Sequence, residues 1–145
     1  MSGLEIRAMK DRELEQVIEL WRACDLTRPH NDPYRDISMA RSQPTSEILV
    51  GLDNGKIIAS IMVGHDGHRG MVYYVSTDPE MRKTGMGRQI MTAAEGWLKD
   101  QGIWKMNLMI RSSNMEVQAF YEAIGFNLEK ISVMSKRLDP PMKPE

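Results

Sequence analysis

Residues 71–88 constrain the fold of this chain more than any other stretch. The segment 71–77 is an apolar and aromatic run too continuous for a strand with one solvated face, which predicts a strand buried on both sides. Asp78-Pro79 ends that strand, because proline fixes φ and cannot donate a hydrogen bond to a neighbouring strand. A helical pattern begins directly after Gly87. Its apolar positions recur with the 3.6-residue period and are Ile90, Met91, Ala94, Trp97 and Leu98.

A strand, a glycine-containing loop and a helix start, in this order, predict an anion-binding site. The first N–H groups of a helix have no intrahelical acceptor, and the helix dipole is positive at that end. Gly85 and Gly87 have no Cβ, so they let the backbone approach a bulky phosphate. Arg82, Lys83 and Arg88 add positive charge. An ordinary strand–helix turn with a solvated basic face stays open on the loop alone, because short glycine motifs often match by chance.

Two better-known phosphate loops do not fit these residues. No Gly-Lys-Ser/Thr follows at the spacing of a P-loop. The third glycine of a Rossmann turn is also missing, because Ile90 stands at its position.

Composition limits the class of protein. A chain of 145 residues, 41% hydrophobic and 27% charged, is expected to form one globular domain over 1–138, with a frayed tail over 139–145. A net charge of −1 argues against a nucleic-acid partner. The single cysteine, Cys24, excludes a disulfide framework and is expected in the core. With no apolar leader and no run of membrane length, we expect a soluble cytoplasmic protein without a membrane partner.

The remaining elements follow from periodicity and turn signals. An antiparallel meander is expected from strands at 4–8, 47–52, 56–63 and 71–77, with Asn54-Gly55 as a hairpin turn. Asp11 is expected to cap a first helix, and a second helix is expected over 34–41. The helix after Gly87 should end near Gly102 and make a strand at 105–110 parallel to the strand at 71–77. A final hairpin is expected through 131–135.

A last helix carries the second group of candidate site residues. Ser113 and Glu116 have the spacing of a capping box, and Gly125 is expected to end the helix. Asn114 and Tyr121 are seven positions apart, nearly two turns, so they project from one side. A core aromatic with a satisfied hydroxyl stays open as the alternative for Tyr121. The expected buried stripe of this helix is Val117, Phe120, Tyr121 and Ile124.

The two motifs together, Arg82-x-x-Gly85-x-Gly87 and Asn114-x₆-Tyr121-x₃-Gly125-Phe126, resemble the GCN5-related N-acetyltransferase (GNAT) family. The resemblance covers about residues 4–138. It implies an α/β acyl-CoA N-acyltransferase fold, a mixed and mostly antiparallel sheet with helices on both faces. The Asp-Gly-His-Arg-Gly turn and the Asn-Asp-Pro loop are further similar to the small bacterial YpeA-like subgroup.

What the resemblance implies about function is acetyl transfer from acetyl-coenzyme A to a primary amine of a small molecule or peptide. The coenzyme would be held by the loop and the strand before it, and Asn114 would touch the coenzyme arm. The amide of Val75 would polarise the carbonyl, and Tyr121 would protonate the leaving thiolate. The implied coenzyme-binding residues are Val75, Ser76, Thr77, Arg82, Lys83, Thr84, Gly85, Met86, Gly87, Arg88 and Asn114.

The general base is where the sequence departs from the family pattern. Many members carry a glutamate on the central strand, whereas 71–77 contain no carboxylate. Asp66, His68, His30, Asp32 or a chain of waters could take that role, and none is assigned. No metal site is expected at His65, Asp66 and His68, because a turn would need a further ligand that the local sequence lacks.

Two other functions stay open. The first is a non-catalytic coenzyme A–binding module, and the second is an unrelated nucleotide-phosphate binder in which Asn114 and Tyr121 have no role. A homodimer is compatible with the sequence, which does not identify the acceptor amine.

Overall fold

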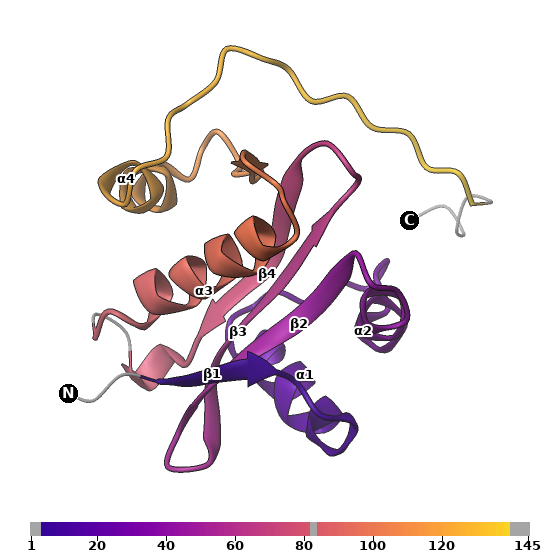
Figure 1. Ribbon diagram of the computed structural model, residues 1–145, viewed down its shortest axis with the longest axis vertical. Coiled ribbons are helices and arrows are strands. Elements are labelled where there is room, and N and C mark those ends of the chain that lie inside the picture. Colours follow the sequence, from indigo (N-terminus) through magenta and orange to yellow (C-terminus); the bar gives the residue numbers. More distant parts are fainter. Residues whose placement is uncertain (1–3, 82–83, 140–145) are drawn as a thin grey trace. The chain divides into compact units, whose positions relative to one another are not determined.

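The computed structural model describes residues 4–81 and 84–139 and divides into two compact units (Figure 1). Unit 1 spans Met1–Leu108 and unit 2 spans Met109–Glu145. No helix in the described ranges is long and apolar enough to cross a membrane.

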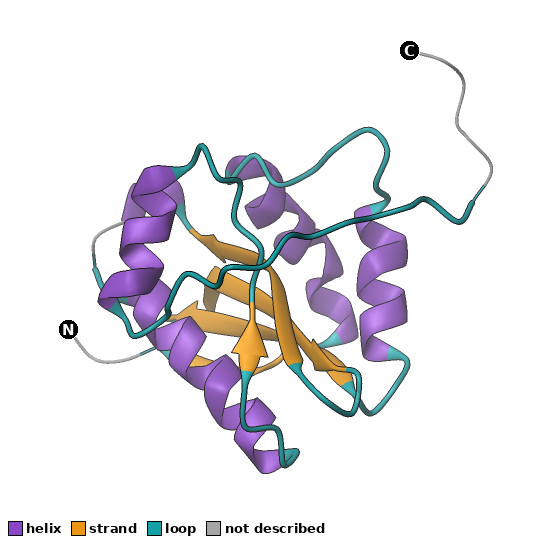
Figure 2. Cartoon of the chain, turned by 90° about the horizontal axis from the view of Figure 1, so that it is seen from above, coloured by secondary structure: helices purple, strands orange, loops and turns teal. Residues whose placement is uncertain are grey.

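Unit 1 is built on a five-stranded sheet whose order follows the chain. Its strands are orange in Figure 2. The strands are β1 (Glu5–Ala8), β2 (Ser46–Asp53), β3 (Lys56–His65), β4 (Gly70–Thr77) and β5 (Met106–Asn107). β1 to β4 pair antiparallel, and β5 pairs parallel to β4 through Gly70↔Met106 and Met71↔Asn107. The mixed, mostly antiparallel sheet and its parallel last pair are confirmed, although β5 is shorter than the expected 105–110.

Helices cover both faces of this sheet (Figure 1). They are η1 (Asp11–Glu13), α1 (Leu14–Ala23), α2 (Pro33–Arg41), η2 (Pro79–Met81) and α3 (Met86–Asp100). α1 and α2 bury a cluster that includes Trp21, Ile37 and Ile48. α3 packs on the opposite face, where Ile90, Met91, Ala94 and Leu98 are buried as the periodicity predicts. Gly70 lets α3 approach β4, because a Cβ there would lie 2.5 Å from Leu98 Cδ1.

Local turn signals fold as expected. Asn54 and Gly55 both have positive φ, 50° and 80°, which is the geometry of a tight two-residue hairpin. Gly102 (φ 82°) follows α3, and the N–H of Ile103 returns to the carbonyl of Leu98 at 3.0 Å. That 6→1 bond closes the helix end in the way a glycine past the C-cap permits.

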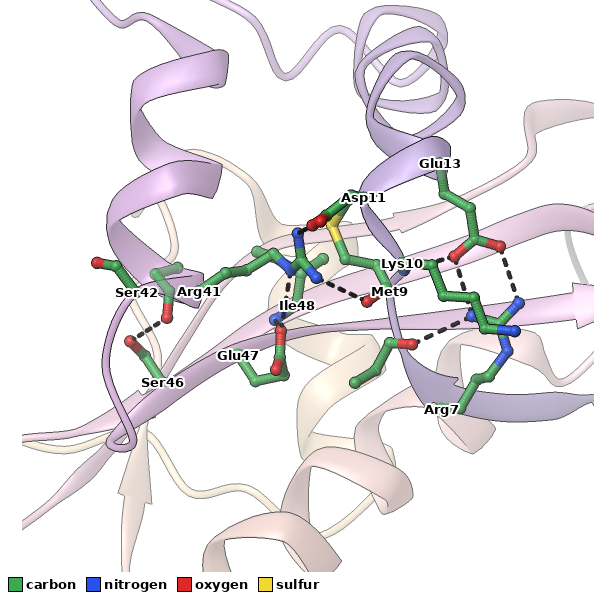
Figure 3. A network of polar contacts seen from close by, with 12 residues as sticks. Arg7, Met9, Lys10, Asp11, Glu13, Arg41, Ser42, Ser46, Glu47 and Ile48 are labelled. Carbon is green, nitrogen blue, oxygen red and sulfur yellow. Dashed lines mark hydrogen bonds and ion pairs between the residues drawn. The ribbon is translucent and has the colours of Figure 1, made fainter.

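The start of α1 differs from the expectation at Asp11. A polar network joins β1, η1, α2 and β2 there (Figure 3). Asp11 accepts from Arg41 Nη1 at 2.6 Å instead of capping the helix. Glu13 closes a capping box at the start of η1, because its Oε1 accepts the N–H of Lys10 at 2.7 Å. Its carboxylate also accepts two hydrogen bonds from Arg7.

Unit 2 contains α4 (Met115–Ala123). Its N-cap is Asn114, whose Oδ1 accepts from the N–H of Val117 at 3.2 Å, so the capping box expected at Ser113 is wrong by one residue. Gly125 (φ 107°) ends the helix as expected, with the N–H of Phe126 bonded to the carbonyl of Tyr121 at 3.0 Å.

The final hairpin expected through 131–135 is wrong for the described residues, which form no strand after α4 (Figure 2). A strand needs a hydrogen-bonding neighbour, and the described part of unit 2 holds one helix and no strand to pair with. For the same reason little apolar surface within unit 2 covers α4: Tyr121 is buried, whereas Val117 and Phe120 are exposed.

Candidate active site

The β4–α3 connection carries most of the candidate coenzyme-binding residues. After β4, Asp78 Oδ1 accepts from the N–H of Glu80 at 3.0 Å, and Thr84 Oγ1 donates to the carbonyl of Met81 at 2.8 Å. Gly85 is the N-cap of α3 with φ 85°. Arg82 and Lys83 lie outside the described residues.

Thr84, Gly85 and Arg88 are exposed at the N-terminus of α3. The N–H of Gln89 makes the first helical bond, to the carbonyl of Gly85 at 3.1 Å. The N–H groups of Met86, Gly87 and Arg88 come before it, and Gly85 supplies no side-chain cap. A Cβ built at Gly85 would meet nothing within 4 Å. Within the helix these three N–H groups have no acceptor, so the positive end of the 15-residue helix suits an anion. Met86 takes part only through its backbone, because its side chain is buried.

β4 carries a β-bulge in its second half. Met62 pairs with Tyr73 and Ser60 with Ser76, so one residue of β3 faces two residues of β4. Tyr74 lies in this bulge with φ 53°, a left-handed conformation that is rare for a tyrosine. A bulge interrupts the ladder and re-aims the backbone of the residues beside it, here Val75.

Tyr74 is held in this conformation from two sides. Its ring stacks on Trp21 with centroids 3.8 Å apart and planes 1° apart. Its hydroxyl donates to Asp36 Oδ2 at 2.6 Å. Burial, together with the carboxylate of Asp36, raises the pKa of Tyr74 well above its usual range, so the hydroxyl stays a donor. Sequence reasoning missed Tyr74 and Asp36, which stand 38 positions apart and share no motif.

The other strand residues of the predicted site have structural partners. Ser76 is buried, and its hydroxyl lies 2.7 Å from that of Ser60, which accepts from Trp21 Nε1 at 2.8 Å. Ser76 can therefore meet a coenzyme only through its backbone. The carbonyl of Thr77 accepts from Cys24 Sγ at 3.1 Å. Cys24 is partly buried against the core cluster, as expected.

A groove of about 520 Å³ opens in unit 1 along α2 and the strands β3 and β4. Its volume is within the range of small-molecule sites. The residues that line it include Asp36, Met39, Met62, Asp66, Arg69 and Tyr73. The groove therefore combines an apolar surface with carboxylates and one arginine.

Two of the candidate bases have structural roles. Asp32 caps α2 by accepting from Tyr34 N–H at 3.0 Å and Arg35 N–H at 3.4 Å. Asp66 Oδ1 accepts the N–H groups of His68 and Arg69, both at 2.8 Å, and these bonds lower the pKa of its carboxyl. The described residues contain no group of three or more His, Cys, Asp or Glu side chains arranged to hold a metal.

Unit 2 carries the other two candidates. Asn114 is exposed at the start of α4. Tyr121 is buried, with its ring edge-on to Phe120 and Phe126 at centroid distances of 5.1 and 5.6 Å. Burial raises the pKa of Tyr121, so its hydroxyl remains protonated at neutral pH and can donate a proton.

Comparison with known families and proteins gives consistent matches. The model of the acetyltransferase (GNAT) family matches residues 14–126. An acetyltransferase of Yersinia pestis (strain Pestoides F) is 37% identical over 135 residues, 93% of this chain and 96% of the relative. An acetyltransferase of Yersinia enterocolitica is 36% identical over 135 residues, with the same coverage of 93% and 96%.

Solved structures show the same fold. AAC(6')-Iy in complex with the bisubstrate analogue CoA-S-monomethyl-acetylneamine has a TM-score of 0.80 at 20% identity, covering 94% of this chain and 99% of that chain. Glucosamine-6-phosphate N-acetyltransferase from Arabidopsis thaliana has a TM-score of 0.74 at 24% identity, covering 95% and 100%. The expected acyl-CoA N-acyltransferase fold is thereby confirmed.

Proposed function

Because this chain belongs to the GNAT family of acetyltransferases, we propose that it moves the acetyl group of acetyl-coenzyme A to a primary amine of a small molecule. The observation that carries the proposal is that α3, the next α-helix after the bulged strand β4, begins without a side-chain cap. We also infer a single acetyltransferase domain over 1–138 in a cytoplasmic protein. The 93% coverage of this chain by the Yersinia relatives supports the single domain.

The backbone of 84–88 is proposed to bind the pyrophosphate of the coenzyme. Three N–H groups at the start of α3 lack intrahelical acceptors, and the helix dipole adds attraction for negative charge. Arg82, Lys83 and Arg88 contribute charge in this proposal. The backbone of Val75, Ser76 and Thr77 would pair with the pantetheine arm, and Asn114 would also contact that arm.

The proposed chemistry needs positioning, polarisation and proton transfer. The amine nitrogen forms a bond to the acetyl carbon, and the C–S bond breaks with its electron pair leaving on sulfur. The N–H of Val75, re-aimed by the bulge, would polarise the acetyl carbonyl. Tyr121 would donate its proton to the sulfur, since burial keeps its hydroxyl protonated.

A small-molecule acceptor is favoured by the groove and by the structural neighbours. One neighbour is named as a complex with an acetylneamine analogue, and another is named a glucosamine-6-phosphate N-acetyltransferase. A groove of about 520 Å³ suits an acceptor of that size.

Turnover is tested by measuring thiol release from acetyl-coenzyme A. The acceptors are neamine, glucosamine 6-phosphate, spermidine and a lysine tripeptide. Coenzyme binding without thiol release on any amine would favour the non-catalytic module.

Gly87→Val is the sharpest test of the coenzyme site. It puts a branched side chain at the second residue of α3, beside the proposed pyrophosphate. We expect the affinity for coenzyme A, measured by calorimetry, to fall by at least about 100-fold, or roughly 2.7 kcal/mol.

Gly96→Ala is the matched control. It changes a glycine inside the same helix, and its added Cβ would meet nothing within 4 Å. It should raise stability by up to about 1 kcal/mol and leave coenzyme affinity unchanged. Equal affinity in Gly87→Val and wild type would remove the loop from the coenzyme site.

A further inference from the structure

β4 contains no carboxylate of its own, yet the fold brings one to it from α2. The Asp36 carboxylate accepts the hydroxyl proton of Tyr74 at 2.6 Å, and Tyr74 is the residue in the bulge. Asp36 therefore lies at the point where β4 departs from regular pairing.

Asp36 also lines the groove. Its neighbours along the groove include Met39 on the same helix and Met62 and Tyr73 on the sheet. The groove lies on the sheet face covered by α2, whereas α3 covers the opposite face (Figure 1). A ligand in the groove would thus approach the bulge from the face opposite to α3.

The chemistry of an amine acceptor requires a group of this kind. A primary alkyl amine has a pKa near that of lysine, about 10.4, so it arrives as an ammonium ion. Its nitrogen has no lone pair to attack with until one proton has left. An anionic oxygen in the groove would both attract the ammonium ion and accept that proton.

Two carboxylates line the groove, and they differ in what already binds them. Asp66 holds the β3–β4 turn through two backbone N–H groups, with His65 and Arg69 beside it on the groove wall. Asp36 accepts one side-chain hydrogen bond, from Tyr74, which fixes its orientation through Oδ2. Asp36 is thus the carboxylate next to the bulge that has capacity for a further donor.

We propose that Asp36 binds the ammonium group of the acceptor in this groove and takes its proton. The acceptor in this proposal is a small molecule that bears a primary amine on a partly apolar body. This inference rests on the proposed acetyl transfer. One proton passes from nitrogen to the Asp36 carboxylate and the freed lone pair forms the C–N bond. The C–S electron pair leaves on sulfur, which takes the proton of Tyr121. The second nitrogen proton replaces the one that Tyr121 gave up, and Asp36 returns its proton to solvent.

Tyr74 acts in this assignment as a positioning residue. Its hydroxyl fixes Asp36 and its ring fixes the bulge against Trp21. The carboxylate and the re-aimed strand backbone are therefore placed by the same side chain.

Asp36→Asn tests the assignment with little risk to the fold. Asparagine keeps the shape and still accepts the Tyr74 hydroxyl, but it carries no charge and cannot take a proton. With the best acceptor among neamine, glucosamine 6-phosphate and spermidine, kcat/KM at pH 7 should fall about 10²–10³-fold. Coenzyme A affinity by calorimetry should stay within about twofold of wild type.

The pH profile separates a proton acceptor from a structural residue. Without a base, the variant reacts only with free amine, so its kcat/KM should rise about tenfold per pH unit up to the pKa of the acceptor. The wild type should reach its plateau at lower pH. The matched control is Glu19→Gln, which removes an exposed carboxylate paired with Arg22 on α1 and should retain the wild-type profile.

The outcomes distinguish the two proposals. A wild-type protein that binds coenzyme A but acetylates none of the amines would overturn the proposed function, and this inference with it. Wild-type turnover with an unchanged rate and profile in Asp36→Asn would overturn the role of Asp36 alone. A reduced rate whose pH profile parallels wild type would likewise exclude Asp36 as the proton acceptor.

Discussion

The left-handed backbone of Tyr74 is an unusual local cost in the described residues. A non-glycine residue in such a conformation costs about 1–3 kcal/mol unless its surroundings fix it. Here they do, because the stack on Trp21 and the hydroxyl bond to Asp36 are both available only with a tyrosine in this position. Strain maintained by two specific contacts is typical of residues that shape a site.

Tyr121 provides the residue-level test of proton transfer at sulfur. Tyr121→Phe keeps the ring contacts with Phe120 and Phe126 and removes only the hydroxyl. If the hydroxyl is the acid, kcat at saturating acetyl-coenzyme A should fall about 10²–10⁴-fold. Stability should change by no more than about 1 kcal/mol. Because burial raises the pKa of Tyr121, its ionisation should not reduce wild-type kcat near neutral pH.

The control for this substitution is Tyr34→Phe. It removes the tyrosine hydroxyl that donates to Glu15 Oε2 at 3.0 Å on the exposed surface of α2. Its kcat and melting temperature should match wild type. Full activity in Tyr121→Phe would leave Tyr121 as a core aromatic residue.

At the level of elements, the network around Glu13 fixes β1 to the start of α1 (Figure 3). The hydrogen bonds from Arg7, with a further one from the Lys10 N–H, lower the pKa of Glu13 to about 2 from 4.5 despite its burial. A lowered folded-state pKa stabilises the fold fully above about pH 4.5, and this contribution is lost as the pH falls toward 2. A shift of this size corresponds to roughly 3 kcal/mol.

Glu13→Gln should therefore lower the free energy of unfolding by roughly 2–4 kcal/mol at pH 6, since it removes the buried carboxylate that accepts two hydrogen bonds from Arg7. Between pH 6 and pH 3 the variant should lose less stability than wild type. Urea denaturation at both pH values measures the difference.

The control is Glu19→Gln, which removes an exposed carboxylate paired with Arg22 and should change stability by under about 0.5 kcal/mol. Equal acid sensitivity of Glu13→Gln and wild type would contradict the assigned pKa.

The elements that the sequence predicts correctly are those with local signals. Asn54-Gly55 specifies its own hairpin, and Gly102 and Gly125 end helices because few other residues adopt positive φ there. The errors at Asp11 and Ser113 are small displacements of caps. Each cap is chosen among neighbouring polar residues by tertiary contacts, such as the bond of Arg41 to Asp11, that a local pattern does not encode.

At the level of the whole molecule, the candidate site depends on pairings distant in sequence. The loop motif predicts the open helix start because strand, glycine and helix are adjacent in the chain. The groove and the Asp36–Tyr74 bond arise from packing α2 on this face of the sheet, which no spacing rule contains. The missed final strands have the same origin, because a strand forms only with a partner and 131–135 carries no information on which partner that is.

Coenzyme binding offers a test of the proposed ligands together, which are residues 75–88, Asn114 and Tyr121. A ligand that binds only the folded state at 100 times its Kd adds about 2.7 kcal/mol of stability. For a chain of this length the melting temperature should rise by roughly 5–15 °C with acetyl-coenzyme A. ATP and NAD should give smaller rises, since they lack the pantetheine arm.

Amide hydrogen exchange would assign that stabilisation to residues. With coenzyme A bound, the N–H groups of Met86, Gly87 and Arg88 gain phosphate acceptors, so peptides covering 84–90 should exchange more slowly. Peptides covering 114–126 should also be protected if Asn114 and Tyr121 take part, beyond any global change seen in the control peptide 14–23 of α1. Protection of 84–90 alone, with ATP as effective as coenzyme A, would identify a general nucleotide-phosphate loop and remove Asn114 and Tyr121 from the site.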